Sequence, residues 1–372
     1  MNGPVDSAFQ FADGLGPEKV IHLYEPRSGL KAILVVDNVA AGPAIGGVRM
    51  APDASLEECV RLARAMTLKN AMAGLAHGGG KAVIIADPHQ PAESKDRLIR
   101  RFAHGIRQIE DYIPGPDMGT NEISMAQMRE ITQRAVGLPR VIGGIPLDEI
   151  GATGYGLAVA LEAAQPFGNF ELANARVVVQ GFGSVGIHAA RFLARQGARL
   201  VGVSDSRGAR ACRDGFDLAT LIAFKQNGGS VADFEAGELI DTDKLISLHC
   251  DIWIPAARPD VINANNARNM NTQVIAQGAN IPATAEAEQI LADRGVLVLP
   301  DFVVNAGGVI CAAVEFHQGS ESQALQTIAD KIGSNTRQVL ERSRSNNELP
   351  RQAAFQIAAE RVQEAMSFQQ LF

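Results

Sequence analysis

The feature that most constrains the fold is a strand–turn–helix–strand pattern over residues 176–205. Residues 176–180 have three valines at their centre and are expected to form a strand, and Gly181-Phe182-Gly183-Ser184-Val185-Gly186 follows with the spacing G-x-G-x-x-G. An apolar helical pattern comes next, then a second apolar run over 200–204 that leads into Asp205. This order of elements is typical of a doubly wound, Rossmann-type α/β domain that binds a dinucleotide.

The glycine turn of this pattern is expected to hold the phosphates of the dinucleotide. Its glycines let the pyrophosphate approach the helix N-terminus, where free N–H groups and the helix dipole favour anions. Asp205 is expected to hydrogen-bond the ribose hydroxyls and to repel a 2′-phosphate, which favours NAD, whereas Arg207 keeps NADP open. The cofactor-binding residues expected in the turn are Gly181, Phe182, Gly183, Ser184, Val185 and Gly186.

Three further apolar runs, over 251–255, 273–276 and 296–299, are expected to be strands of the same sheet. The loops after them would surround the cofactor, because ligands of such sheets bind at the carboxyl ends of the strands. Asn280 and Asn305 are expected to bind the nicotinamide, its ribose or the substrate, or else to be turn residues. The cofactor contacts expected in these loops are Ala256, Asn280 and Asn305.

A second stretch that points to chemistry is Gly78-Gly79-Gly80-Lys81, which precedes the apolar run 82–86. We expect the glycines to form a turn with positive φ angles and the lysine to be partly desolvated. Desolvation favours the neutral form of a lysine, which can accept a proton. The alternative is a glycine turn with an exposed lysine. A helix that starts after Ser55 leads to Lys69, so both lysines are expected to face one cleft and to attract a carboxylate.

Asp117 is the carboxylate expected to work with these lysines. It follows Pro114-Gly115-Pro116, whose prolines would fix a loop and present the side chain rigidly. A carboxylate beside a lysine suits general acid–base chemistry. The alternative is that Asp117 caps the helix expected over 121–134. Further back in the chain, the glycine-rich stretch Gly42–Met50 is expected to be a turn that lines a pocket.

Length and composition indicate two domains of an ordinary globular protein. The chain has 372 residues, of which 46% are apolar and 20% are charged. Residues 138–151 are predicted to be a linker between two domains. The first domain (1–145) is expected to bind the substrate and to mediate oligomerisation, and the second (146–334) is expected to bind the dinucleotide. The helical residues 335–372 are expected to pack back on the first domain. We expect a cleft between the two α/β domains.

Charge and cysteine usage exclude several classes of partner. The net charge of −7 comes without a basic block, so nucleic acid is not expected as a partner. No apolar run is long enough to span a membrane, and the first residues do not resemble a signal peptide. Four widely separated cysteines and seven scattered histidines predict no disulfide framework and no metal site. A cytoplasmic protein is expected.

Taken together, these segments resemble the Glu/Leu/Phe/Val dehydrogenase family of amino-acid dehydrogenases over about residues 30–320. The motifs occur in the same order throughout. They are Gly42–Met50, Met66-Thr67-Leu68-Lys69-Asn70, Gly78–Lys81, Pro116-Asp117-Met118-Gly119-Thr120, Ala152-Thr153-Gly154-Tyr155-Gly156, Gly181–Gly186 and Asn305-Ala306-Gly307-Gly308-Val309.

The resemblance implies a role for each matching residue. Lys69 would hold the substrate α-carboxylate, Lys81 would activate water and stabilise the carbinolamine oxygen, and Asp117 would shuttle protons to and from the amine. Hydride would leave Cα for the nicotinamide, and water would convert the imine to a 2-oxo acid and ammonia. Residues implied to lie near the substrate or nicotinamide are Gly46, Gly47, Thr153, Asn280 and Asn305. The resemblance also implies a homo-oligomer built through the first domain.

The substrate side chain is expected to be apolar. Glutamate dehydrogenases hold the side-chain carboxylate with a lysine and a serine at positions that are Ile45 and Ala312 here. An apolar pocket would leave a carboxylate unpaired, which costs several kcal/mol. We therefore expect a branched-chain amino acid, with Ile45, Val309 and Ala312 lining the pocket. The alternatives are glutamate or an aromatic amino acid, and more remotely a non-catalytic dinucleotide-binding regulator.

Overall fold

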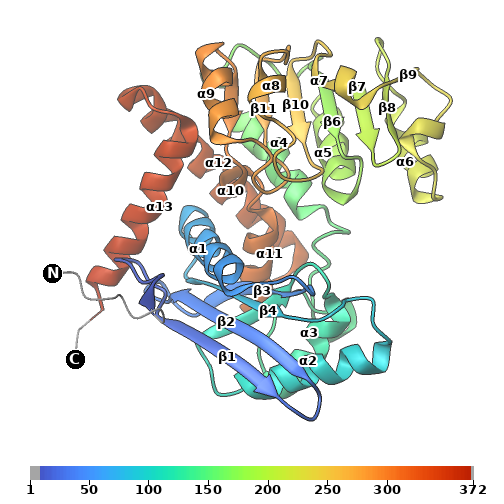
Figure 1. The fold of residues 1–372 in the computed structure, drawn as a ribbon. Coiled ribbons are helices and arrows are strands. Elements are labelled where there is room, and N and C mark those ends of the chain that lie inside the picture. The colour runs from blue at the N-terminus through green and yellow to red at the C-terminus, as the bar shows by residue number, and fades with distance from the viewer. Residues whose placement is uncertain (1–8, 370–372) are drawn as a thin grey trace. The chain divides into compact units, whose positions relative to one another are not determined.

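The computed structural model describes residues 9–369, which form two compact units. Of these residues, unit 1 contains 9–146, Val309–Ala324 and 355–369. Unit 2 contains Leu147–Gly308 and Leu325–Ala354. Both units are α/β, as the sequence predicted, and each has its own sheet (Figure 1).

The sheet of unit 1 has five strands in the order β1-β2-β4-β3-β5. Strands β1, β2 and β4 run antiparallel to their neighbours in this series, whereas β3 is parallel to both β4 and β5. The strands are β1 (Lys19–Glu25), β2 (Leu30–Asn38), β3 (Ala44–Met50), β4 (Gly79–Ile84) and β5 (Tyr112–Pro116).

Helices cover both faces of this sheet, which explains why β2 is apolar at successive positions. Ile33 and Val35 belong to one buried cluster with α1, whereas Leu34 and Val36 belong to another with α2 and α3. Side chains alternate between the faces of a strand, so a strand covered on both faces has no polar side. The helices are α1 (Leu56–Met72), α2 (Ala92–Ile106) and α3 (Glu122–Thr132).

The sheet of unit 2 has seven strands in the order β12-β11-β10-β6-β7-β8-β9. The strands from β12 to β7 are parallel, and β8 and β9 continue the sheet in antiparallel fashion. The predicted strand and helix around the glycine turn are β6 and α5, so the doubly wound expectation is confirmed. The strands are β6 (Arg176–Gln180), β7 (Arg199–Asp205), β8 (Gly208–Ala211), β9 (Glu238–Ile240), β10 (Ile252–Pro255), β11 (Val274–Ala276) and β12 (Leu297–Leu299).

The remaining helices belong to unit 2, except that most of α11, the start of α12 and the later part of α13 belong to unit 1. They are α4 (Ala152–Ala164), α5 (Ser184–Arg195), α6 (Leu218–Gln226), α7 (Thr242–Ile246), α8 (Ala264–Ala267), α9 (Ala285–Asp293), α10 (Asp301–Val304), α11 (Gly307–Phe316), α12 (Glu321–Asn346) and α13 (Pro350–Ser367). Within the described part of the chain, no helix is long and apolar enough to cross a membrane.

The C-terminal helices divide between the units differently from the prediction that 335–372 pack on the first domain. The larger part of α12 belongs to unit 2, where Ile332 packs at Gly156 of α4. Arg351, at the start of α13, forms ion pairs with Glu288 and Asp301 of the same unit. Only the later part of α13 belongs to unit 1, where Arg361 donates hydrogen bonds to carbonyl groups at the end of α1.

Three segments predicted as turns or loops are strands. Residues 44–50 of the stretch 42–50 form β3, and the second and third of the three glycines, Gly79 and Gly80, lie inside β4. Neither has a positive φ angle, so these glycines are required by close approach rather than by turn geometry. The segment Pro114-Gly115-Pro116 lies in β5, where prolines are tolerated because β5 is at the edge of the sheet.

Candidate active site

Lys81 and Asp117 meet in unit 1, although they are far apart in the sequence. Lys81 lies in β4 with its side chain 7% exposed, and its Nζ donates a hydrogen bond to Oδ2 of Asp117. Asp117 follows directly after β5, and β3 lies between β4 and β5 in the sheet. The strand order therefore brings the predicted lysine and carboxylate together across β3.

Asp117 does not cap the helix that follows it. Asn121 is the N-cap of α3 and accepts a hydrogen bond from the backbone N–H of Ser124. Thr120 fixes the backbone of Asp117 instead. Its hydroxyl accepts a hydrogen bond from the backbone N–H of Asp117 and donates one to the carbonyl oxygen of Val48. This leaves the Asp117 carboxylate available for the lysine.

Arg49 is a second cation on Asp117 that the sequence analysis did not identify. Its Nε donates to the same Oδ2 at 3.2 Å, and its Nη1 pairs with Glu58 at the start of α1. Arg49 lies two residues after Gly47 on β3, and residues at this spacing face the same side of a strand. That spacing was a usable signal, but it was missed because the segment was interpreted as a turn.

Gly47 leaves the space in which this cluster forms. A Cβ atom at position 47 would lie 2.8 Å from Cβ of Asp117 and 3.3 Å from Nζ of Lys81. The absence of a side chain therefore permits the lysine and the carboxylate to meet beside β3.

The surrounding charges keep Asp117 ionised. Burial by itself would raise the pKa of this carboxyl, but the charge and hydrogen bond of Lys81 and the charge of Arg49 outweigh it. The pKa of Asp117 consequently lies below the ordinary value of an aspartate. An ionised carboxylate in this position can accept a proton from a cationic amine.

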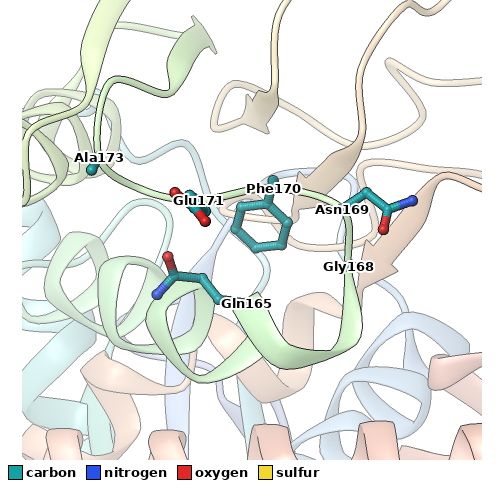
Figure 2. A pocket seen from close by; sticks show the side chains of 6 residues that line it. All are labelled: Gln165, Gly168, Asn169, Phe170, Glu171 and Ala173. Atoms are coloured by element: carbon teal, nitrogen blue, oxygen red, sulfur yellow. The ribbon is translucent and has the colours of Figure 1, made fainter.

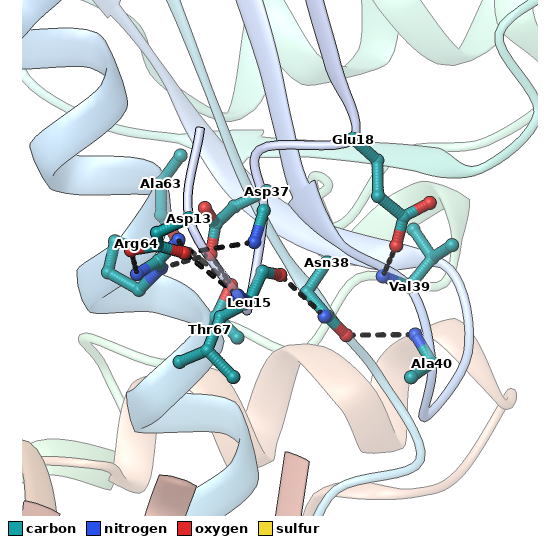
Figure 3. Close-up of polar contacts among 11 residues, drawn as sticks. Asp13, Leu15, Glu18, Asp37, Asn38, Val39, Ala40, Ala63, Arg64 and Thr67 are labelled. Atoms are coloured by element: carbon teal, nitrogen blue, oxygen red, sulfur yellow. Dashed lines mark hydrogen bonds and ion pairs between the residues drawn. The ribbon is translucent and has the colours of Figure 1, made fainter. Parts of the chain in front are cut away.

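Lys69 lies in the last turn of α1 and is half-buried. A polar cluster fixes this helix over β2 (Figure 3). The buried Asp37 accepts hydrogen bonds from Thr67 Oγ1 at 2.6 Å and Arg64 Nε at 2.9 Å. Arg64 also forms two hydrogen bonds with Asp13, which ties the N-terminal segment to α1.

Gly79 of β4 allows α1 to lie close against the sheet. A Cβ atom at Gly79 would approach the backbone nitrogen of Thr67 to 1.9 Å, so any side chain there would displace the helix. Because Lys69 and Lys81 each lie two residues from this contact, it fixes the backbone of α1 and of β4 near both lysines.

The residues expected around the substrate side chain all lie in unit 1. Ile45 and Gly46 are in β3, where Ile45 is 3% exposed and the absent Cβ of Gly46 would clash with the carbonyl of Gly80. Val309 and Ala312 are in α11, with Ala312 buried and Val309 half-buried. Glu315 anchors this helix within unit 1 by accepting hydrogen bonds from backbone N–H groups of residues 138 and 145.

The glycine turn of unit 2 has the geometry of a phosphate cradle. Gly181 has a φ of +93°, and its N–H and that of Phe182 donate to the carbonyl oxygen of Ser204 on β7. A Cβ atom at Gly183 would meet no protein atom within 4 Å, so this glycine leaves open space at the N-terminus of α5. Gly186 instead serves packing, since its Cβ would lie 2.1 Å from the Gly181 carbonyl oxygen. The turn therefore fits a dinucleotide pyrophosphate.

The other two residues of the turn differ in their surroundings. The hydroxyl of Ser184, the first residue of α5, donates to Asp148 at 3.3 Å and is exposed. Val185 is half-buried. Both lie where the turn meets the helix.

Asp205 lies at the end of β7, beside the glycine turn as predicted, but its carboxylate is already occupied. Its Oδ1 accepts from Arg207 N and Ser230 Oγ, and its Oδ2 accepts from Lys225 Nζ and Val231 N. A carboxylate has about four acceptor positions, so the protein itself satisfies this side chain. The expected hydrogen bonds to ribose hydroxyls would have to displace these donors.

Asn305 carries an unpaired acceptor that suits an amide ligand. Its Nδ2 donates to the carbonyl of Gly278 at 3.3 Å and to Oδ1 of Asn280 at 3.1 Å, whereas its buried Oδ1 has no partner. Neither asparagine has a positive φ angle, so the alternative of a left-handed turn residue does not apply. Thr153 is in the first turn of α4, and its hydroxyl would lie 3.6 Å from a Cβ at Gly308.

Ala256 follows β10 and closes the other side of the glycine turn. A Cβ at Gly181 would lie 2.8 Å from the backbone of Ala256.

A separate surface pocket of unit 2 holds none of the predicted site residues and lies at the turn after α4 (Figure 2). It is lined by Gln165, Gly168, Asn169, Phe170, Glu171 and Ala173.

Comparison with family sequence models gives two matches that cover most of the chain. The model described as Glutamate/Leucine/Phenylalanine/Valine dehydrogenase matches residues 143–370. The model described as Glu/Leu/Phe/Val dehydrogenase, dimerisation domain, matches residues 17–134.

Several proteins with similar sequences are named glutamate dehydrogenase. A glutamate dehydrogenase of Aeropyrum pernix is 37% identical over 88% of this chain and 84% of its own length. The NADP-specific enzyme of Saccharolobus shibatae is 37% identical over 79% of this chain and 74% of its own. The catabolic NAD-specific enzyme of Bacillus subtilis is 36% identical over 80% of this chain and 73% of its own.

Solved structures with the same fold include two with different substrates in their names. The hetero-hexameric glutamate dehydrogenase of Thermus thermophilus, in its leucine-bound form, superposes with a TM-score of 0.83 and 28% identity. That match covers 96% of this chain and 91% of the other. The L-tryptophan dehydrogenase of Nostoc punctiforme gives a TM-score of 0.75 and 26% identity over 95% of this chain and 97% of its own.

Proposed function

We propose, on the premise that the chain belongs to the Glu/Leu/Phe/Val dehydrogenase family of NAD(P)-dependent oxidoreductases, that it deaminates an L-amino acid oxidatively and reversibly. The products are the 2-oxo acid, ammonia and the reduced dinucleotide, with one water consumed. The observation that carries this proposal is the ion pair between the buried Lys81 and the half-buried Asp117.

Each proposed catalytic side chain has one task. The ammonium group of Lys69 pairs with the substrate α-carboxylate and so orients Cα. Asp117 accepts a proton from the substrate ammonium, which frees the nitrogen lone pair to form the C=N bond as hydride leaves Cα. Lys81 holds the attacking water and stabilises the carbinolamine oxygen, and Asp117 returns a proton to the departing nitrogen.

The dinucleotide, when bound, supplies the acceptor of the hydride. In unit 2, the turn from Gly181 to Gly186 would hold its pyrophosphate at the N-terminus of α5. Asn305 would receive the nicotinamide amide on its unpaired Oδ1, with Asn280 and Thr153 beside it.

L-glutamate is the substrate that the names of the relatives favour, and we propose it as the first candidate. This differs from the branched-chain substrate expected from the sequence, which no comparison supports. The relatives named glutamate dehydrogenase include proteins with 37% identity over most of this chain.

An apolar amino acid is the second candidate, because of one specific observation. Ile45 and Ala312 are both buried and apolar, and they stand where the resemblance implies a lysine and a serine in glutamate dehydrogenases. A buried aliphatic contact is worth about 0.8 kcal/mol per CH₂ group, whereas an unpaired carboxylate would be penalised. A tryptophan dehydrogenase among the structural neighbours is consistent with variation at this pocket.

A substrate panel separates the two candidates. Oxidative deamination is measured with glutamate, leucine, isoleucine, valine, phenylalanine and tryptophan, each with NAD and with NADP. Glutamate as the best substrate supports the first candidate and shows that Ile45 and Ala312 do not exclude a carboxylate. Turnover of an apolar amino acid without glutamate supports the second. Dinucleotide binding without any turnover contradicts the proposed reaction and favours a regulator.

Replacement of the proposed catalytic lysine tests the reaction itself. Lys81→Ala is expected to lower kcat by about 100- to 10,000-fold while dinucleotide binding persists, since the turn at Gly181 is in the other unit. The control is Lys31→Ala, which removes an exposed lysine from the neighbouring strand β2 and is expected to keep wild-type activity. Equal activity of the Lys81→Ala variant would refute the role of this lysine.

A further inference from the structure

The end of β7 carries a lysine that changes the expected electrostatics of the ribose site. Lys225, from α6, places its Nζ 2.6 Å from Oδ2 of Asp205, and the two side chains are 19% and 11% exposed. In the usual arrangement, an acid at this strand end hydrogen-bonds the ribose 2′-hydroxyl of NAD, and its negative charge disfavours a 2′-phosphate. Here the acid is paired within the protein.

This pair lies next to the phosphate cradle. The carbonyl oxygen of Ser204, the residue before Asp205, accepts hydrogen bonds from the N–H groups of Gly181 and Phe182 at 3.0 and 2.8 Å. The adenine ribose of a dinucleotide whose pyrophosphate rests on this turn therefore lies near Asp205 and Lys225.

A second ion pair beside it also offers a cation. Arg207, in the turn between β7 and β8, pairs with Asp233 at 2.9 Å, and the two side chains are 63% and 51% exposed. Exposed pairs of this kind are held weakly, so the guanidinium group can turn to another anion at little cost. Lys225 and Arg207 thus neutralise the negative charges of Asp205 and Asp233 near the expected position of the ribose.

We propose that Lys225 is a specificity-determining residue that makes this site accept the 2′-phosphate of NADP as well as the 2′-hydroxyl of NAD. Lys225 neutralises the charge of Asp205, and the two ammonium protons that do not bond to Asp205 can donate hydrogen bonds to the 2′-phosphate. This inference rests on the proposed function only in taking a dinucleotide as the ligand of unit 2.

The key variant removes the cation and leaves the acid in place. In Lys225→Met, the Asp205 carboxylate keeps three donors, which are Ser230 Oγ and the N–H groups of Arg207 and Val231. Asp205 therefore stays ionised in a folded domain but is no longer balanced. Its charge would then repel a 2′-phosphate, since like charges at close range in a partly buried site interact strongly.

The test measures binding without turnover. Dissociation constants of NADH and NADPH are obtained from dinucleotide fluorescence, and those of AMP and adenosine 2′,5′-bisphosphate from calorimetry. The wild-type protein is expected to bind NADH and NADPH within about tenfold of each other. In Lys225→Met, the ratio of the NADPH to the NADH dissociation constant is expected to rise at least tenfold, and the bisphosphate is expected to lose affinity relative to AMP.

Three controls make the result specific. Lys225→Arg keeps the charge and is expected to keep the wild-type ratio. Adding Asp205→Asn to Lys225→Met removes the unbalanced charge and is expected to restore NADPH binding. Lys244→Met removes a lysine that is 73% exposed elsewhere in unit 2 and is expected to leave the ratio unchanged.

The outcomes separate this inference from the proposed function. An unchanged ratio in Lys225→Met, or a wild-type protein that binds NADH but rejects NADPH more than 100-fold, overturns the role of Lys225 and leaves the proposed reaction standing. A wild-type protein that binds neither dinucleotide overturns both.

Discussion

At the scale of single residues, the site depends on how one carboxylate oxygen is shared. Lys81 and Arg49 both donate to Oδ2 of Asp117, and Arg49 is itself held by Glu58. Lys81 has a proposed chemical task, whereas Arg49 acts through Asp117 and is a positioning residue. The two cations hold the carboxylate ionised and fix its direction before substrate binds.

The pH dependence of catalysis tests the role of Arg49. Asp117 must be ionised to accept a proton, so kcat/KM falls as the pH decreases through its pKa. Arg49 lowers that pKa, and its removal in Arg49→Met is therefore expected to move the acidic limb of the kcat/KM profile to higher pH.

Two comparisons make this test specific. Arg49→Lys keeps a positive charge and is expected to keep the limb closer to that of the wild type. Arg100→Met, which removes an exposed ion pair with Glu130 in the same unit, is expected to leave the profile unchanged. A uniform loss of rate in Arg49→Met without a displaced limb would show that Arg49 is only structural.

At the scale of elements, Gly79 of β4 sets how closely α1 approaches the sheet, and its two glycine neighbours fit against other strands. Gly78, Gly79 and Gly80 each face atoms of a neighbouring segment that a Cβ would contact at 3.0 Å or less. The tightest contacts are with the Asn38 carbonyl oxygen and the Thr67 nitrogen. Gly79 and Gly80 thus serve packing against α1 and Tyr112, Gly78 serves packing against the end of β2, and together they fix the backbone that carries Lys81.

Gly79→Ala tests this packing. The new Cβ would lie 1.9 Å from the backbone nitrogen of Thr67, so α1 must move. We expect a loss of about 1–3 kcal/mol in the free energy of unfolding, together with reduced kcat/KM because Lys69 moves with the helix. Thermal or denaturant unfolding and steady-state kinetics measure the two effects.

Gly14→Ala is the matched control, because a Cβ at position 14 meets no atom within 4 Å and its φ is not positive. It is expected to alter neither quantity. Wild-type stability in Gly79→Ala would contradict the close packing of α1 on β4.

At the scale of the whole molecule, the chain is expected to assemble with copies of itself. The family model that matches residues 17–134 is described as a dimerisation domain. In unit 1, β1 is an edge strand and Tyr24 on it is 68% exposed. Exposed apolar side chains on a sheet edge are common where subunits join.

Light scattering coupled to size exclusion tests this expectation. The mass is expected to be an integer multiple of 39.4 kDa, at least twice that of one chain, over a tenfold range of protein concentration. A mass of 39.4 kDa throughout that range would contradict a homo-oligomer.

Local patterns in the sequence determined much of the fold. The glycine turn with its strands and helix was predictable because all its elements lie within 30 consecutive residues, 176–205, and their contacts are local. The same holds for the three later strands of unit 2. Lys81 and Asp117 were also singled out from their local patterns, and the structure brings these two side chains together, whereas the role of Lys69 stays a prediction.

The tertiary structure alone decided which side chains meet. Arg49 and Asp117 are 68 positions apart, and their contact depends on the strand order β4-β3-β5, which no local pattern specifies. Lys225 reaches Asp205 from α6, 20 positions later, and only the folded chain shows that the acid is neutralised. Likewise, the glycines before Lys81 were interpreted as a turn. The structure shows that glycine is needed there because a helix and neighbouring strands from elsewhere in the chain pack too closely for a side chain.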